Sequence, residues 1–197
     1  TPLRLIPWSR LLTALMIASA MAHAKAVDVL LDSGADPNLA DANGYTSLHR
    51  VVRDSDYGIN LAATDAILTI VKSLLKHGAN PNARLVQDKE KAAEEIKNGN
   101  VQIEGKRSAV TVDEIILQGA TPLFLAAEVN NLDVIKTLVA GGADPLIASD
   151  RGTTPLMMAA GAGTDVQRER EPEERATAAE TAKFLVEHGA DVNAAGQ

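Results

Sequence analysis

The chain has 197 residues, of which 46% are hydrophobic and 23% are charged, and this ordinary globular composition excludes a wholly disordered chain. Its formal net charge of -7 and its few aromatic residues, one Trp, two Tyr and two Phe, argue against a nucleic-acid partner. The absence of cysteine excludes disulfides and thiolate metal sites, and no apolar run of about eighteen residues predicts a membrane span.

The chain begins with an apolar segment, residues 1–12, that contains no glycine. Two arginines in this segment, the apolar stretch 11–21 and the Ala-His-Ala motif at 22–24 have the order of a secretory signal. One alternative is therefore a secreted or periplasmic protein in which residues 1–24 act as a signal peptide. A cytoplasmic protein is favoured, because a helical repeat pattern begins inside this stretch at Thr13.

Residues 13–45 carry two short motifs at a fixed distance. The motif Thr-x-Leu begins at Thr13, Gly-Ala-Asp begins 21 positions later at Gly34, and the next Thr-x-Leu begins 33 positions after the first, at Thr46. A threonine before an apolar run caps the first amides of a helix, and a glycine after such a run ends it. We therefore expect two helices, an inner one after Thr13 and an outer one before Gly34.

Residues 46–85 repeat both motifs at a longer distance. Gly78 follows Thr46 by 32 positions, eleven more than in the first segment. The additional residues fall between the inner and the outer helix, so we expect an extended hairpin in this segment.

An insert at residues 86–118 separates this segment from the next. It adds 31 residues where the regular segments have a short turn. Residues 88–97 are charged helix formers that predict an exposed helix, and the alternation in 101–104 and 109–112 predicts a small hairpin, so we expect a helix or hairpin finger. The finger is either a solvated insertion or a projecting partner contact, and we expect any binding specificity to lie near it.

The most regular segment is residues 119–153. It reads Thr121-Pro-Leu-Phe-Leu-Ala-Ala127, then Asn131-Leu-Asp-Val-Ile-Lys-Thr-Leu138, then Gly142-Ala-Asp144. The next Thr-x-Leu begins 33 positions after Thr121, and in residues 154–197 the motifs are again further apart, by fourteen residues. The two motifs and the period of 33 resemble the ankyrin repeat family.

The resemblance implies an all-α fold, an ankyrin-repeat solenoid of about four stacked helix-turn-helix repeats with long inserts. The chain starts at Thr1 without a methionine and ends at Gln197, just before a fifth repeat would begin, so we expect it to be a fragment of a longer array. The expected organisation is an N-terminal apolar segment 1–12, repeat 1 at 13–45, repeat 2 at 46–85, the insert at 86–118, repeat 3 at 119–153 and repeat 4 at 154–197.

The repeat pattern explains the residues that could otherwise take part in catalysis or metal binding. The four histidines fall at repeat positions at which ankyrin proteins often carry histidine, and the acidic run near residues 173–180 is expected to be solvated. A Ser-His-Asp arrangement and a phosphate loop are not found. We therefore expect no catalytic residue, no metal and no cofactor, and hence a protein that is not an enzyme. The four histidines are His23, His49, His77 and His188.

The resemblance also implies a function, because ankyrin proteins generally hold a protein partner across the turn tips and the inner-helix surface. We therefore expect a protein–protein interaction scaffold that binds on the concave face. The expected anchors are Tyr45, Arg53 and Arg151, since aromatic and guanidinium groups contribute most to interfaces. The alternative is a self-assembling scaffold or filament subunit, in which an apolar end of the array binds another copy. The expected contacts are Asn43, Tyr45, Asp150 and Arg151 at the tips and Arg53, Asp54 and Glu128 on the inner helices.

Overall fold

The structure, a computed structural model, describes residues 12–41, 44–53, 63–86, 117–161 and 172–196. Within these residues it contains helices and no strand, which confirms the predicted all-α repeat stack. The inner helices are α1 (Ala14–Ala20), α3 (Ser47–Arg53), α7 (Pro122–Glu128) and α9 (Pro155–Ala160). The outer helices are α2 (Ala24–Asp32), α4 (Ala63–Lys76), α8 (Leu132–Ala140) and α10 (Pro172–Glu187).

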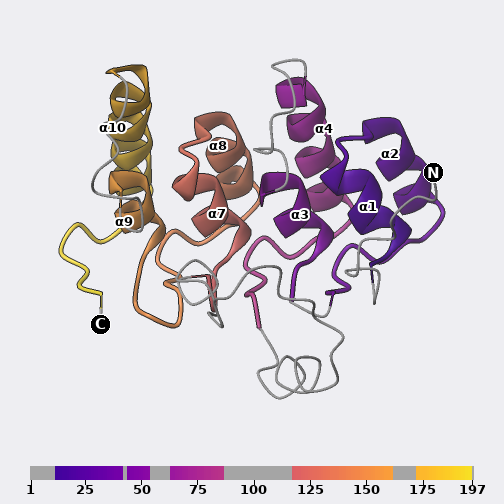
Figure 1. The fold of residues 1–197 in the computed structure, drawn as a ribbon, viewed down its shortest axis with the longest axis horizontal. Coiled ribbons are helices and arrows are strands. Elements are labelled where there is room, and N and C mark those ends of the chain that lie inside the picture. Colours follow the sequence, from indigo (N-terminus) through magenta and orange to yellow (C-terminus); the bar gives the residue numbers. More distant parts are fainter. Residues whose placement is uncertain (1–11, 42–43, 54–62, 87–116, 162–171, 197) are drawn as a thin grey trace, which may run out of the picture.

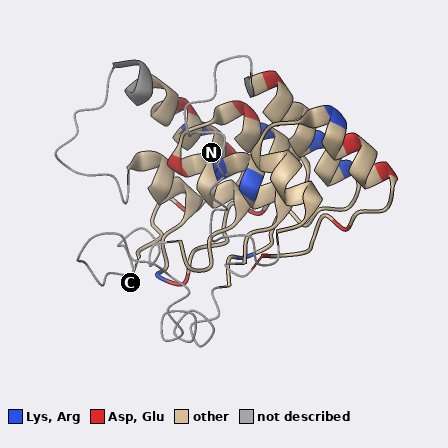
Figure 2. Cartoon of the chain, turned by 45° about the vertical axis from the view of Figure 1, so that its right-hand side comes forward, with Lys and Arg blue, Asp and Glu red and all other residues tan. Residues whose placement is uncertain are grey.

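The helices form two layers. Each inner helix packs against the outer helix that follows it and against the inner helices of the neighbouring repeats, and the outer helices pack side by side in the same order. Figure 1 shows the pairs in sequence order, from the indigo N-terminal pair to the yellow C-terminal pair, with the connecting loops projecting below the inner helices. Residues of both charge signs are distributed over these helices (Figure 2).

Helices α1, α7 and α9 begin as the sequence predicts. The hydroxyl oxygens of Thr13, Thr121 and Thr154 each accept a hydrogen bond from the backbone amide three residues later, at 3.2 Å. Such caps satisfy one of the amides that a helix start leaves without a partner. Two of the inner helices also have proline in their first turn, where no hydrogen bond is lost.

The outer helices of repeats 2 and 4 are longer than the other two. Helices α2 and α8 have 9 residues each, whereas α4 has 14 and α10 has 16. Some of the additional residues of the extended hairpins therefore belong to the outer helices, which they lengthen at the N-terminal end. Each outer helix is followed by a glycine with a positive φ, between +84° and +96°, which only glycine adopts without strain and which ends the helix.

An asparagine links each of the first two repeats to the next. The Nδ2 atom of Asn38 donates to the carbonyl oxygen of Gly78 at 2.9 Å, and its Oδ1 accepts from the amide of Asn80 at 2.7 Å. Asn82 makes the same pair of bonds to repeat 3, at 3.0 and 2.8 Å. At the corresponding position, repeat 3 has Leu146, which is 56% exposed. The junction between repeats 3 and 4 therefore has no asparagine bridge.

The turn tip that carries the insert keeps the base of a regular tip. In the regular tips, the amides of Gly44 and Gly152 donate to the carbonyl oxygen three residues earlier, at 3.0 and 2.9 Å. At the insert, Gly119 makes this bond to the carbonyl oxygen of Leu85, at 2.8 Å, although 33 residues lie between them. The insert thus starts and ends at one closed turn base, and length added at such a place costs little free energy.

The hydrophobic core runs between the two layers along the whole described array. Phe124, Leu123 and the small pair Ala126 and Ala127 are fully buried in repeat 3, where the small residues let neighbouring inner helices approach closely. Residues 12–24, which the signal-peptide alternative requires, form α1 and the start of α2. The predicted segments 1–11, 88–97, 101–104 and 109–112 lie outside the described residues.

Candidate functional site

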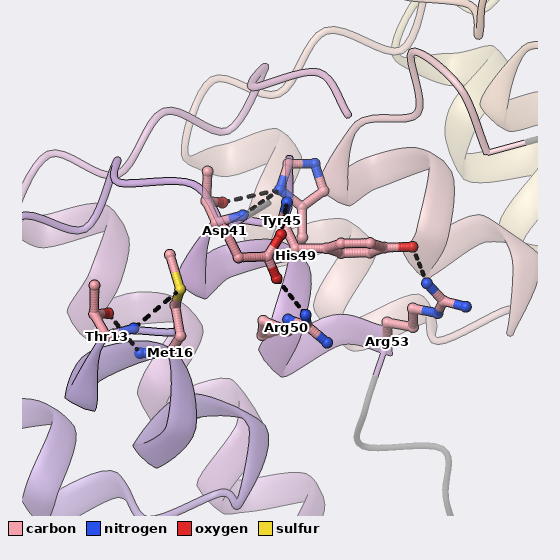
Figure 3. A network of polar contacts seen from close by, with 8 residues as sticks. Thr13, Met16, Asp41, Tyr45, His49, Arg50 and Arg53 are labelled. Atoms are coloured by element: carbon pink, nitrogen blue, oxygen red, sulfur yellow. Dashed lines mark hydrogen bonds and ion pairs between the residues drawn. The ribbon is translucent and has the colours of Figure 1, made fainter. Parts of the chain in front are cut away.

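A buried ion pair stands where the first turn tip meets α3. Asp41 accepts a hydrogen bond from the amide of Tyr45 at 3.0 Å and forms an ion pair with the guanidinium of Arg50 (Figure 3). Both charged side chains are almost completely buried. A buried charge is tolerated only when it is paired and hydrogen-bonded, so this contact fixes the tip to the inner helix.

The aromatic ring of Tyr45 lies against two guanidinium groups. The Cζ atoms of Arg50 and Arg53 lie 4.7 and 5.0 Å from the ring centroid, within the range of cation–π interactions. Arg53 also donates a hydrogen bond to the Tyr45 hydroxyl, which Figure 3 shows at the far end of the ring. We call Asp41, Tyr45, Arg50 and Arg53 the tyrosine–arginine cluster. It contains two cations and one carboxylate.

The prediction that Tyr45 is an exposed anchor for a partner is wrong. Its side chain is 4% exposed, because the ring fills the space between the tip and α3 instead of projecting from the tip. The role that the structure gives Tyr45 is to position Arg53. The guanidinium of Arg53 is half-buried and, among the described residues, forms an ion pair with no carboxylate.

His49 joins α3 to the next repeat. Its Nδ1 accepts hydrogen bonds from the amide and the hydroxyl of Thr46, at 3.3 and 2.9 Å, so the proton resides on Nε2, which faces the carbonyl oxygen of Ala120 at 3.4 Å. Burial lowers the pKa of His49 to about 4, which keeps the ring neutral at physiological pH. His49 is therefore a structural residue.

The other predicted contacts on the inner helices lie at the C-terminal ends of adjacent helices. Arg53 is the last residue of α3 and Glu128 is the last residue of α7. Both are accessible to solvent, together with the apolar neighbours Met21 after α1 and Val129 after α7. The structure thus brings these four residues to the same end of neighbouring inner helices. The predicted contact Asp54 lies outside the described residues.

At the tips, one predicted contact already has a partner within the chain. Asp150 forms an ion pair with Arg84 at 2.8 Å, and its amide donates to the carbonyl oxygen of Gln118 at 2.8 Å. Gly119 allows this close approach, because a Cβ atom there would lie 2.3 Å from the Asp150 carboxylate. Arg151 is exposed beside this pair, and the predicted contact Asn43 lies outside the described residues.

Sequence comparisons identify the repeat. Residues 91–196 match the family model described as ankyrin repeats in three copies, residues 12–59 match ankyrin repeats in many copies, and residues 43–84 match a single ankyrin repeat. The chain belongs to the ankyrin repeat family. Ankyrin repeats are protein–protein interaction modules, and the inner-helix ends described above are accessible surface on such a module.

The similar proteins that the comparisons found are much longer than this chain. The ankyrin chain is 31% identical to neurogenic locus notch homolog protein 1 of Xenopus tropicalis over 150 residues, which cover 75% of this chain and 6% of that protein. It is 29% identical to neurogenic locus notch homolog protein 1 of Homo sapiens over 150 residues, 75% of this chain and 5% of that protein. The similarity therefore concerns the ankyrin array and a small share of each relative.

The part of the ankyrin array that the structure describes gives no sign of a metal site or of a membrane-spanning helix. This part contains no group of three or more side chains that could hold a metal ion. None of its helices combines the length and the apolar character that crossing a bilayer requires.

Two features of the site escaped sequence reasoning. One is the ion pair between Asp41 and Arg50, since they lie nine positions apart in the sequence and only the folded tip brings them together. The other is the burial of Tyr45, for which a signal exists. Its counterpart in repeat 3 is Ala120, which lies directly before the helix cap Thr121 and is fully buried.

Proposed function

We propose that this ankyrin array binds a protein partner across the ends of its inner helices and the neighbouring turn tips, on the concave side of the stack. The observation that carries the proposal is Arg53. Its guanidinium contacts the ring and the hydroxyl of Tyr45 and is partly exposed to solvent. It forms no ion pair with a carboxylate among the residues that the structure describes. A charged donor that is fixed before binding loses little conformational entropy when a partner carboxylate reaches it.

The surroundings of Arg53 favour a mixed contact. Met21 and Val129 expose apolar side chains on the flanking repeats, and Glu128 contributes a carboxylate next to Val129. Interfaces combine apolar contact at their centre with a few oriented polar groups around it. The proposed partner therefore presents an acidic side chain to Arg53 and apolar side chains to its neighbours. Arg151, Asp150, Asn43 and Asp54 extend the proposed surface.

Site-specific photo-crosslinking tests this proposal without knowledge of the partner. The photoreactive residue p-benzoylphenylalanine replaces Val129 on the inner-helix surface in one variant and Val29 on the exposed face of α2 in a matched variant. Both proteins are expressed in the source cells and irradiated. We expect a discrete crosslinked species from position 129, and we expect the Arg53→Glu substitution in the same chain to abolish it. Crosslinks from position 29 alone would contradict the proposed surface.

Self-association is a second candidate, and exposed apolar side chains favour it. Ile17 on α1 is exposed, although its counterparts Arg50 and Leu125 in repeats 2 and 3 are buried against the preceding repeat. An open apolar face of a repeat array can bind a second copy head to tail. Size-exclusion chromatography with light scattering distinguishes the candidates. A concentration-dependent series that Ile17→Glu removes supports self-association, and a monomer at all concentrations contradicts it.

A further inference from the structure

The outer helices differ in how each junction between repeats is closed. Between α2 and α4, the Ser73 hydroxyl donates to the Asp28 carboxylate at 2.5 Å, and Nε2 of His77 lies 3.3 Å from the Asp32 carboxylate. These two polar bridges lie one helical turn apart and close the first junction on its outer side. The residues that correspond to these four in the later repeats are found by their distance from the glycine that ends each outer helix.

Both bridges are missing at the junction between α4 and α8. Six positions before the glycine, Lys72 takes the place that Asp28 has in repeat 1, and directly before the glycine, Gly141 takes the place of His77. Asp32 is likewise replaced, by Lys76. This junction can therefore form neither the hydroxyl–carboxylate bond nor the histidine–carboxylate contact of the first one.

A groove of about 400 Å³ opens where these bridges are absent. Its walls are mostly apolar, because Leu75 of α4 faces Ala140 and Gly141 at the end of α8. Gly141 lies in close contact with Leu75, whose Cδ1 atom would lie 2.6 Å from a Cβ atom at position 141, so a side chain at this position would have to displace Leu75. The lining residues are Lys72, Leu75, Lys136, Thr137, Ala140 and Gly141.

Two exposed lysines line this apolar space, and a third follows on α4. Lys72 and Lys136 line the groove from the two helices, and Lys76 follows one turn after Lys72 on α4. Within the described part of the chain none of the three forms an ion pair, whereas Lys183 on α10 pairs with Glu187 at 3.9 Å. Asp133, three residues before Lys136, also forms no ion pair with it. The surface thus combines an apolar floor with unpaired positive charge.

We propose that this outer groove is a second protein-binding site, which takes an acidic peptide segment with one aliphatic side chain flanked by carboxylates. The aliphatic side chain enters the groove over Leu75 and Ala140, and the flanking carboxylates reach Lys72 and Lys136. Because the groove lies on the outer helices, its occupant and a partner on the inner helices do not compete for the same residues.

The charge pattern favours a peptide over other anionic partners. Two lysines that line a shallow groove, with Lys76 one turn away on α4, are fewer than the stripes of positive charge that bind nucleic acid. The outer helices also expose acidic side chains, among them Glu187, and the charges over the helices are mixed (Figure 2). A broad anionic surface such as a membrane would meet these carboxylates, whereas a short peptide contacts the lysines alone.

A titration followed by ¹H–¹⁵N NMR tests the site with a defined probe, the synthetic peptide acetyl-Glu-Asp-Leu-Glu-Asp-amide. We expect saturable shifts of the Leu75, Thr137, Ala140 and Gly141 amides that weaken at high salt, since exposed ion pairs are screened. The double variant Lys72→Glu with Lys136→Glu should raise the Kd at least tenfold. The matched variant Lys25→Glu, a charge reversal on the exposed face of α2, should leave the Kd within twofold.

A second variant fills the groove without changing its charge. Ala140 is exposed, so Ala140→Leu should leave the thermal unfolding temperature unchanged and raise the Kd at least tenfold. The proposal is overturned if the shifts map to the inner helices, if acetyl-Lys-Lys-Leu-Lys-Lys-amide binds equally well, or if the probe causes no shift at millimolar concentration. Lysine-dependent binding to heparin or to anionic phosphatidylserine vesicles that exceeds binding of the peptide overturns it as well.

Discussion

The asparagine bridge between repeats gives a quantitative prediction for stability. Asn82 donates to the carbonyl oxygen of Gly142 and accepts from the amide of Asp144, and Leu146 stands in its place one repeat later. Each such bond contributes about 0.5–1.5 kcal/mol net, and the pair is exposed, which favours the lower half of that range. We expect Asn82→Leu to lower the free energy of unfolding by about 1–2 kcal/mol.

The reverse substitution should strengthen repeat 4. Leu146→Asn places an amide where it can bridge to repeat 4 as Asn82 bridges to repeat 3, and we expect a gain of about 1 kcal/mol. Urea unfolding followed by circular dichroism gives the global change, and native-state hydrogen exchange locates it. Protection should rise in α10 and stay unchanged in α1. The matched control is Leu39→Asn, which makes the same change at a loop residue that is 49% exposed.

Two results would refute this reasoning. If Asn82→Leu changes the free energy of unfolding by less than about 0.3 kcal/mol, water replaces the bridge without cost. If Leu39→Asn stabilises the chain as much as Leu146→Asn does, the gain comes from removing exposed apolar surface and not from a bond between repeats.

Three further predictions follow from named contacts. His49 has a folded pKa of about 4 against 6.5 in the unfolded chain, so below pH 6.5 the unfolded state binds the proton first and stability falls by about 3 kcal/mol toward pH 4. His49→Phe should reduce this dependence of the free energy of unfolding on pH, measured by urea unfolding at pH 4–7. An unchanged dependence would mean that other groups cause it. Asp41→Asn removes the buried ion pair between Asp41 and Arg50 and should cost about 3–5 kcal/mol, measured by urea unfolding, and a loss below about 1 kcal/mol would contradict this. Ala22, with φ +54°, corresponds to Asn130, with φ +52°, so Ala22→Asn should raise the stability by about 0.5 kcal/mol, and a decrease would contradict the strain argument.

The repeat stack could be predicted from the sequence because its signals are local. A threonine cap, an apolar run and a stop glycine each act within a few residues, and their recurrence places both helices of every repeat. The inner helix after Thr121 and the outer helix before Gly142 are confirmed at α7 and α8. Local signals did not show how far the long hairpins continue as helix, and the structure begins α4 at Ala63 and α10 at Pro172.

The candidate site was harder to predict, because its residues acquire their roles through the packing of neighbouring repeats. Tyr45 follows a tip glycine and reads as an exposed tip residue, yet the closed turn directs its ring inward onto two arginines. Arg53 was identified from its place on the inner helix, and its orientation by Tyr45 was not. The groove on the outer side depends on Leu75 of α4 facing Ala140 and Gly141 at the end of α8, which a reading of single repeats does not reveal.

The central claim is that a protein partner binds through the inner-helix ends, with Arg53 as the anchor. Isothermal titration of the crosslinked partner, once purified, against three chains tests this claim most directly: the parent chain, Arg53→Ala and the outer-helix control Lys25→Ala. We expect a Kd at least tenfold higher for Arg53→Ala, an unchanged unfolding temperature, and a Kd within twofold of the parent for Lys25→Ala. Equal affinities for all three chains would contradict it.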